Sequence, residues 1–357
     1  MSFRSTSGEE TPESNSNMER DIMKLNHIAV LGTASILALG LAGQASAADI
    51  KERTLRFSFL NAKDHPQGMG AARFAELVSK ASGGKITVKL FGSGVLGGDV
   101  QTVSSIQGGT LDFTVLNAGL LSSHAKEFVL FDLPFLFNSG KEADAIVDGP
   151  IGNKLLARLQ GKGMVGLGYW ELGFRHLTNN VRPVAKMEDI AGLKVRVVQS
   201  PLYIEMFSAL GANPVPMPFT ELYTALEQRA VDGQENPEAT ILGTKLNEVQ
   251  KYMTLTGHIY NPQVLLASQK LWDQLSADEK KLLQKAARDA TLYQRKVNRD
   301  GAAQALAKLK ASMKVNELSA AEKGRIRIKL QGVTKKFSEN VGPQLMGELN
   351  SELAKLR

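Results

Sequence analysis

The chain has no cysteine in its 357 residues, and other residues of metal and nucleophile chemistry are sparse. Without cysteine there is no disulfide, no thiolate nucleophile and no cysteine-ligated metal site. The histidines do not stand in the H-E-x-x-H spacing of a zinc site, and no G-x-S-x-G nucleophile elbow occurs. The histidines are His27, His65, His124, His176 and His258. We therefore expect no metal, no cofactor and no covalent catalysis.

Signatures of nucleic-acid binding are also missing, although the chain is basic, with a formal net charge of +7. It has no zinc finger, RNA-recognition motif or arginine-rich tail, and its lysines and arginines are spread along the sequence. A solvated basic surface explains this distribution, so we expect no nucleic acid as a partner. Anionic ligands and anionic membrane surfaces remain candidate partners.

The first long apolar run, residues 29–42, is too short for a membrane span, which takes about 20 apolar residues. Lys24 precedes this run, and Ala45-Ser46-Ala47 follows it with the small-x-small pattern of a signal-peptidase site. Residues 23–48 are therefore predicted to be a secretory signal peptide rather than a membrane anchor, which places the mature protein in the periplasm. Residues 1–22 are polar and are interpreted as a mis-called start or a non-native extension.

The mature chain begins with a β-α-β-α-β pattern. Its strands are predicted at 54–60, 86–91 and 111–116, and its helices at 66–81 and 100–107 with Asp99 as the N-cap. Strands that alternate with helices predict a parallel sheet. The chain is long enough for two such domains.

A second α/β unit follows, and the C-terminal third is helical. Its strands are predicted at 164–169, 193–198, 213–217 and 231–232, with a return strand at 264–270. Helices are predicted at 202–210 and, capped by Thr220, up to about residue 230. Ser276 and Ser319 begin capping boxes of later helices, and Gly301 indicates a bend in the first of them. No low-complexity linker separates the units, so we expect the chain to cross between them more than once.

The stretch "FGSGVLGGD" at 91–99 contains the G-x-G-x-x-G spacing of a dinucleotide-binding loop. In that fingerprint the third glycine lies inside the helix and an acid ends the next strand. Here Gly92, Gly94 and Gly97 all precede Asp99, and Asp112 stands at the start of its strand. The spacing therefore does not favour a nicotinamide enzyme. It favours a loop whose backbone comes close to a ligand or to the other lobe.

Polar residues gather where the predicted strands end. In open α/β sheets, ligands bind outside the carboxyl ends of the strands. Two sheets that present such residues to a shared cleft describe a two-lobed binding protein. The residues that follow the strands are 61–65, 92–99, Asn117, Trp170 to Arg175, Phe219 and Asn236.

Arg196 is the one charged residue inside the apolar segment "VRVV" of a predicted strand. A buried guanidinium is expensive unless it is paired. One explanation is an internal aspartate or glutamate partner. The other is a ligand carboxylate held by the planar guanidinium in a bidentate pair.

Five segments of the chain are distinctive when taken together: "GVLGGDVQTVSSIQGGTLDFTV", "FDLPFLF", "GYWELGFRHLTN", "DIAGLKVRVVQSPLYIEMFSALGANPVPMPFTELYTALEQRAVDGQENP" and "EVQKYMTLTGHIYNPQVLLAS". They resemble the solute-binding proteins of TRAP (tripartite ATP-independent periplasmic) transporters, and the resemblance covers the chain from about Thr54 to its end. The resemblance implies two α/β lobes, hinge strands, a long helix that spans both lobes, and closure on a ligand that is passed to a membrane permease.

The resemblance also implies roles for site residues. The family's carboxylate-binding arginine falls on Arg196, and its supporting arginine falls on Arg175. Its ligand-packing aromatic falls on Phe219, and the asparagine of the "VDGQENP" segment is Asn236. Asn117 stands where sialic-acid-binding members have an acid, which argues against sialic acid. Asp99, His65 and Trp170 complete the predicted ligand-binding set, with a helix N-cap as the alternative role of His65.

The sequence therefore predicts a non-enzymatic receptor for a small organic acid, with a sugar acid such as a hexuronate or aldonate favoured. A C4-dicarboxylate is the alternative, with Arg175 taking the second carboxylate. An exported carbohydrate-modifying enzyme is a further alternative, but it needs two facing carboxylates and only Asp99 is well placed. Lobe I is predicted at 49–172 plus 263–301, and lobe II at 173–262 plus 302–357.

Expressed with its leader, the mature protein is expected to begin at Ala48 or Asp49, because Ala45-Ser46-Ala47 forms the cleavage site. N-terminal sequencing of the secreted protein measures this. A chain that begins at Met23 and sediments with membranes would contradict the prediction.

Overall fold

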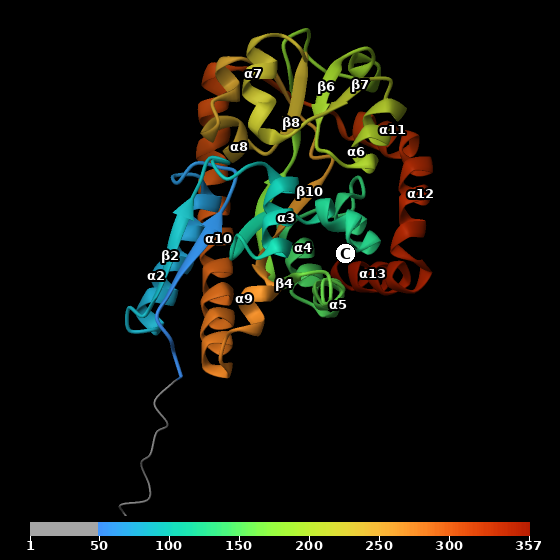
Figure 1. Ribbon diagram of the computed structural model, residues 1–357. Helices are drawn as coiled ribbons and strands as arrows, with labels where there is room; N and C mark the ends of the chain where they lie inside the picture. Colours follow the sequence, from blue (N-terminus) through green and yellow to red (C-terminus); the bar gives the residue numbers. More distant parts are fainter. Residues whose placement is uncertain (1–48) are drawn as a thin grey trace, which may run out of the picture. The chain divides into compact units, whose positions relative to one another are not determined.

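The computed structural model describes residues 49–357, and the predicted extension and signal peptide lie outside the described residues. Within this range no helix is both long enough and apolar enough to cross a membrane. The elements belong to two sheets covered by helices (Figure 1).

The first sheet has the strand order β2-β1-β3-β10-β4. Its strands are β1 (Arg53–Ser58), β2 (Ile86–Phe91), β3 (Phe113–Asn117), β4 (Met164–Phe174) and β10 (Tyr260–Ser268). β1 is parallel to β2 and β3, but β10 is antiparallel to both β3 and β4. The parallel pairing predicted for the opening strands is therefore confirmed, and the return strand β10, which enters from the second sheet, makes the sheet mixed.

The second sheet has the order β11-β9-β5-β8-β6-β7 and is also mixed. Its strands are β5 (His176–Asn179), β6 (Lys194–Val197), β7 (Asn213–Pro216), β8 (Gly233–Asn236), β9 (Tyr252–Leu255) and β11 (Lys314–Glu317). β6 is parallel to β7 and β8, whereas β5 is antiparallel to β8 and β9. The boundaries proposed for the two lobes stay a prediction.

Helices cover the faces of both sheets (Figure 1). The α-helices are α2 (Pro66–Ala81), α3 (Asp99–Gly108), α4 (Gly140–Val147), α5 (Pro150–Ala157), α6 (Pro201–Ala209), α7 (Leu222–Glu227), α8 (Glu238–Gly243), α9 (Gln269–Asp273), α10 (Ala277–Ser312), α11 (Ala320–Lys329), α12 (Gln331–Val341) and α13 (Pro343–Leu356). Short 3-10 segments are η1 (Ala118–Ser123), η2 (Lys126–Asp132), η3 (Met187–Ile190), η4 (Phe219–Glu221) and η5 (Leu246–Glu248).

The 36-residue helix α10 contacts elements of both halves: α2 and β4 of the first, α8 and β11 of the second (Figure 1). The predicted capping box is present, since Ser276 Oγ accepts from Glu279 N and the Glu279 carboxylate accepts from Ser276 N. The helix continues through Gly301, so the expected bend does not interrupt it. The second predicted N-cap, Ser319, accepts from Glu322 N at the start of α11.

Three local expectations are corrected. Gly98, not Asp99, is the N-cap of α3, because Gln101 Oε1 accepts from Gly98 N at 2.6 Å. Thr220 lies inside η4 rather than capping a helix. The strand expected at 231–232 begins two residues later, because Asp232 turns its carboxylate to the Lys194 amide.

Trp170 is an aromatic core residue. β4 extends past the predicted end at residue 169, so Trp170 lies within the strand and is 1% exposed. Its ring centroid is 6.0 Å from that of Phe57, in a cluster with Phe74 and Phe113. Burial of this large ring in the core keeps it away from the cleft, which corrects its assignment to the binding set.

Candidate functional site

A narrow cavity between the two sheets brings together five of the eight predicted site residues. The five are Asp99, Asn117, Arg175, Arg196 and Phe219. The remaining lining residues are Leu60, Asn61, Leu120, Leu172, Val198, Gln199, Met217, Pro218, Thr240 and Gln263. The cavity therefore joins the ends of β1 and β3 to β6 and the segment after β7.

Arg196 on β6 is 3% exposed and has no acidic partner within ion-pair distance in the described chain. Its Nε and Nη2 groups both donate to the Met217 carbonyl, at 3.1 and 2.8 Å. Its guanidinium carbon lies 5.9 Å from the Phe219 ring centroid. Burial lowers its pKa to about 10, which still leaves it cationic at neutral pH. The internal-acid explanation is thus not supported, and a buried positive charge faces the cavity.

Arg175, between β4 and β5, is paired inside the protein. Its Nε donates to Glu235 Oε2 at 2.5 Å and its Nη2 to Glu235 Oε1 at 2.9 Å, and both side chains are at most 1% exposed. Nη1 donates to Asn261 Oδ1 at 3.1 Å. Burial opposes ionisation of Glu235, but Arg175 and His258 outweigh it and hold the glutamate pKa below its ordinary value. Arg175 therefore keeps at most one N–H, on Nη1, for a ligand.

Asn236 does not line the cavity but supports Arg175. It ends β8, where its Oδ1 accepts from Arg175 Nη2 at 3.1 Å. Its Nδ2 donates to Gln234 Oε1 at 2.6 Å. Both ends of the amide are thus engaged with the protein, so in this structure Asn236 orients the arginine rather than offering a free group.

His65 is the N-cap of α2, and its side chain also lies behind the cavity wall. Its Nδ1 accepts from Gln67 N at 3.0 Å, so the ring proton is assigned to Nε2, which lies 3.4 Å from Thr240 Oγ1. Burial lowers the pKa of His65 to about 3, so the ring is neutral at physiological pH. This contact links α2 of the first half to α8 of the second.

Asp99, the first residue of α3, presents a carboxyl group to the cavity. Burial raises its pKa to about 7, although Arg196 and Arg175 act in the opposite direction. Near neutral pH the group is therefore divided between the acid, which can donate a hydrogen bond, and the carboxylate, which can only accept.

The glycine loop at 92–98 closes against the second half. Gly94 has φ +65°, and a Cβ there would lie 2.7 Å from Thr220 Cγ2. A Cβ on Gly98 would lie 3.6 Å from Pro218. The loop thus brings backbone close to the opposite lobe, as its glycine spacing predicted. Only glycine fits at Gly94 without strain.

Sequence reasoning did not assign Gln263, Thr240 or Glu235 to the site. Gln263 is a buried polar residue in the apolar return strand, the same signal that identified Arg196. Glu235 directly precedes Asn236 in the segment already singled out. Thr240 carries no such signal, because it reaches the cavity through the position of α8.

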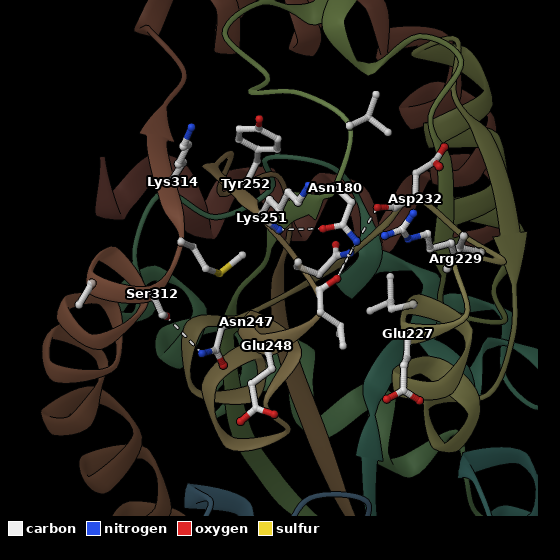
Figure 2. A pocket seen from close by; sticks show the side chains of 17 residues that line it. Asn180, Glu227, Arg229, Asp232, Asn247, Glu248, Lys251, Tyr252, Ser312 and Lys314 are labelled. Atoms are coloured by element: carbon white, nitrogen blue, oxygen red, sulfur yellow. Dashed lines mark hydrogen bonds between the residues drawn. The ribbon is translucent and has the colours of Figure 1, made fainter.

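A wider hollow lies where strands β8, β9 and β11 of the second sheet begin (Figure 2). It contains none of the predicted site residues. Its amides are hydrogen-bonded to the surrounding chain: Asn180 Nδ2 donates to Val249 O, and Asn247 Nδ2 donates to Ser312 Oγ (Figure 2). We therefore place the site in the narrow cavity. Within residues 49–357 no group of three or more histidine and acidic side chains is arranged to hold a metal ion.

Comparison with known proteins identifies a family. The family described as bacterial extracellular solute-binding protein, family 7, matches residues 57–340. The 2,3-diketo-L-gulonate-binding periplasmic protein YiaO of Escherichia coli strain K12 is 37% identical, over 73% of this chain and 80% of its own length. The C4-dicarboxylate-binding periplasmic protein DctP of Rhodobacter capsulatus is 31% identical, over 92% of this chain and 98% of its own.

A solved structure is similar over the same region. The sugar acid binding protein DctPAm of Advenella mimigardefordensis, crystallised with galactonate, superimposes with a TM-score of 0.85 and is 46% identical. The match covers 87% of this chain and all of that one.

The two buried arginines are expected to differ in their effect on stability. Arg175→Met leaves the Glu235 carboxylate buried without its main partner, so we expect a loss of about 3–5 kcal/mol. Arg196→Met strands no carboxylate and removes a costly buried charge, so the ligand-free variant should melt close to or above the wild type. Thermal and denaturant unfolding measure this. Removing both charges with Arg175→Met/Glu235→Gln should recover part of the loss, whereas equal losses in the two single variants would refute the assignment.

Asp99 is expected to make the ligand-free protein less stable as pH rises. Because its folded pKa is about 7 and its ordinary value 3.8, the folded protein holds a proton that the unfolded chain releases between these values. Stability therefore falls from about pH 4 to about pH 7 and then levels off. The gain in melting temperature from Asp99→Asn should be larger at pH 8 than at pH 5, with the surface variant Asp289→Asn as control. An equal gain at both pH values would contradict the shift.

Proposed function

Since the chain belongs to family 7 of the bacterial extracellular solute-binding proteins, the TRAP solute receptors, we propose that it binds a sugar acid such as a hexuronate or aldonate in the interlobe cavity. The proposal includes a periplasmic location and delivery of the ligand to a TRAP-type membrane permease. Members of this family bind sugar acids and other carboxylates, and the relatives are solute-binding receptors rather than enzymes. The carbohydrate-modifying enzyme is therefore set aside.

The observation that carries the proposal is the state of Arg196. It is a buried cation in the cavity wall, and among residues 49–357 its side chain is hydrogen-bonded only to the Met217 carbonyl. A carboxylate bound there neutralises a costly buried charge and gains charge-assisted hydrogen bonds. Phe219 lies beside the guanidinium and supplies an apolar surface for the carbon chain of the ligand.

Sugar acids are favoured over C4-dicarboxylates because only one arginine is available. A dicarboxylate needs a second cation, and the predicted candidate, Arg175, is neutralised by Glu235. The other polar side chains of the wall are neutral amides, a hydroxyl and a partly protonated carboxyl: Asn61, Asn117, Gln199, Gln263, Thr240 and Asp99. Such groups suit hydroxyls. The similarity to the dicarboxylate-binding protein of Rhodobacter capsulatus keeps the alternative as a second ligand class to test.

Ligand entry and release are proposed to follow movement of the two lobes. The loop at 92–98 lies close to Thr220 and Pro218, and His65 Nε2 lies 3.4 Å from Thr240 Oγ1. Both are contacts between the two halves, and we expect them to separate when a sugar acid enters. Asp99, Asn117, Arg196 and Phe219 are proposed to contact the ligand, with Arg175, Asn236 and His65 in supporting positions.

Arg196→Lys is expected to weaken binding of a sugar acid while the protein stays folded. Lysine supplies charge but not two parallel N–H donors, and damage to a desolvated charge pair costs about 2–5 kcal/mol, or roughly 30- to several-thousand-fold in affinity. Calorimetric titration with galactonate and galacturonate measures this.

Arg182→Lys is a matched control, because Arg182 also donates only to backbone carbonyls, those of Asp189 and Ala191, but lies outside the cavity. It should bind like the wild type. Near-native affinity in Arg196→Lys would overturn the carboxylate assignment.

A further inference from the structure

Four amide side chains form a continuous row of hydrogen bonds along the first-half wall of the cavity: Asn61, Gln67, Gln263 and Asn117. Asn61, Gln263 and Asn117 line the cavity, and Gln67 lies behind them on the first turn of α2. Gln67 is 1% exposed, Gln263 3% and Asn61 4%. None of these side chains is charged, so the row acts on a ligand only through which of its atoms donate hydrogen bonds and which accept them.

The direction of the row is set by a backbone amide. Asn61 N donates to Gln67 Oε1 at 3.0 Å. A backbone nitrogen carries hydrogen and cannot accept, so the Gln67 atom that faces it must be oxygen. The Gln67 amino group then points to Gln263 and donates to its Oε1 at 3.1 Å. Gln263 Nε2 in turn donates to Asn117 Oδ1 at 3.2 Å.

The two ends of the row present different groups to the cavity. Asn117 has its oxygen occupied by Gln263, so its Nδ2 amino group is the one left without a partner among residues 49–357. Asn61 donates its Nδ2 to Gln67 Oε1 at 2.9 Å, and its Oδ1 is buried without a hydrogen bond. The wall therefore offers one donor, at Asn117, and one acceptor, at Asn61.

We propose that Gln67 is a positioning residue that fixes this donor–acceptor pair and thereby selects polyhydroxy acids over dicarboxylates. The inference rests on the proposed function. A hydroxyl can donate to Asn61 Oδ1 and accept from Asn117 Nδ2. A second ionised carboxylate has no hydrogen, so it leaves Asn61 Oδ1 buried and unpaired, and unpaired buried acceptors are penalised.

Gln67→Glu reverses the row when the new side chain is ionised. The carboxylate still accepts from Asn61, but it has no hydrogen to give to Gln263. Gln263 must then turn its amino group toward Glu and its oxygen toward Asn117, which turns in response and presents its own oxygen to the cavity. The donor at the wall becomes an acceptor. We expect galactonate affinity to fall about tenfold at high pH.

At low pH the effect should disappear. A protonated glutamic acid donates its O–H to Gln263 Oε1 and restores the original direction, so the affinity of Gln67→Glu should recover as pH falls. Gln67→Met matches the original side chain in length but has no hydrogen to donate to Gln263 at any pH, so its galactonate affinity should show no such recovery. Calorimetric titrations with galactonate and with succinate, from pH 5 to pH 9, compare the affinities of both variants with that of the wild type. Because Asp99 titrates in all three proteins, its effect on affinity drops out of the comparison at each pH.

The outcomes separate this inference from the proposed function. If galactonate affinity recovers at low pH in Gln67→Glu but not in Gln67→Met, the fixed hydrogen-bond direction of the row is supported. Equal losses in Gln67→Glu and Gln67→Met at every pH, with sugar-acid binding by the wild type, overturn the row and leave the receptor proposal intact. A wild type that prefers succinate to galactonate overturns both. Should Gln67→Glu not fold, Asn117→Asp makes the same exchange of donor for acceptor at the wall, and unchanged galactonate affinity there would overturn the inference.

Discussion

The ion pair between Arg175 and Glu235 determines how charge is distributed around the cavity. Both side chains are buried, and their two-fold contact neutralises each of them inside the protein. Because this acid is paired with Arg175, Arg196 faces the cavity with a carbonyl as its one hydrogen-bond partner in the described part of the chain. The fold thus holds one neutralised and one uncompensated guanidinium side by side. An anionic ligand with a single carboxylate matches this arrangement better than one with two.

Much of the fold could be predicted because local signals and tertiary packing agree. Pro66 at a helix start and the alternation at 86–91 gave elements that the structure reproduces residue for residue, α2 and β2. The capping box at Ser276 marked the start of α10. Expectations failed where long-range contacts decide. The predicted end of β4 at residue 169 is wrong, because the strand pairs with β10 as far as Phe174, and Trp170 within it packs in the core.

The candidate site divides in the same way. Arg196 could be found because a lone charge in an apolar strand is conspicuous, and Phe219, Asn117 and Asp99 because they follow strands. The roles of Arg175 and Asn236 could not be derived from position alone, since each depends on a partner far away in sequence: Glu235 for Arg175, and Arg175 for Asn236. For His65, the following Pro66 did indicate the N-cap role, but not the contact with Thr240. Pattern identifies which residues approach a cleft, but only the hydrogen-bond partners decide which groups remain free.

Helix α10 has a consequence for how the molecule folds. Its 36 residues correspond to a rod of about 54 Å that packs on α2 and β4 of the first half and on α8 and β11 of the second. The chain also crosses between the sheets at β4–β5 and at β9–β10. Neither half is therefore a contiguous stretch of sequence, and neither can complete its core while the other is unfolded. The halves should melt together in one cooperative transition, and a fragment cut at a lobe boundary would lack the strands needed to assemble on its own.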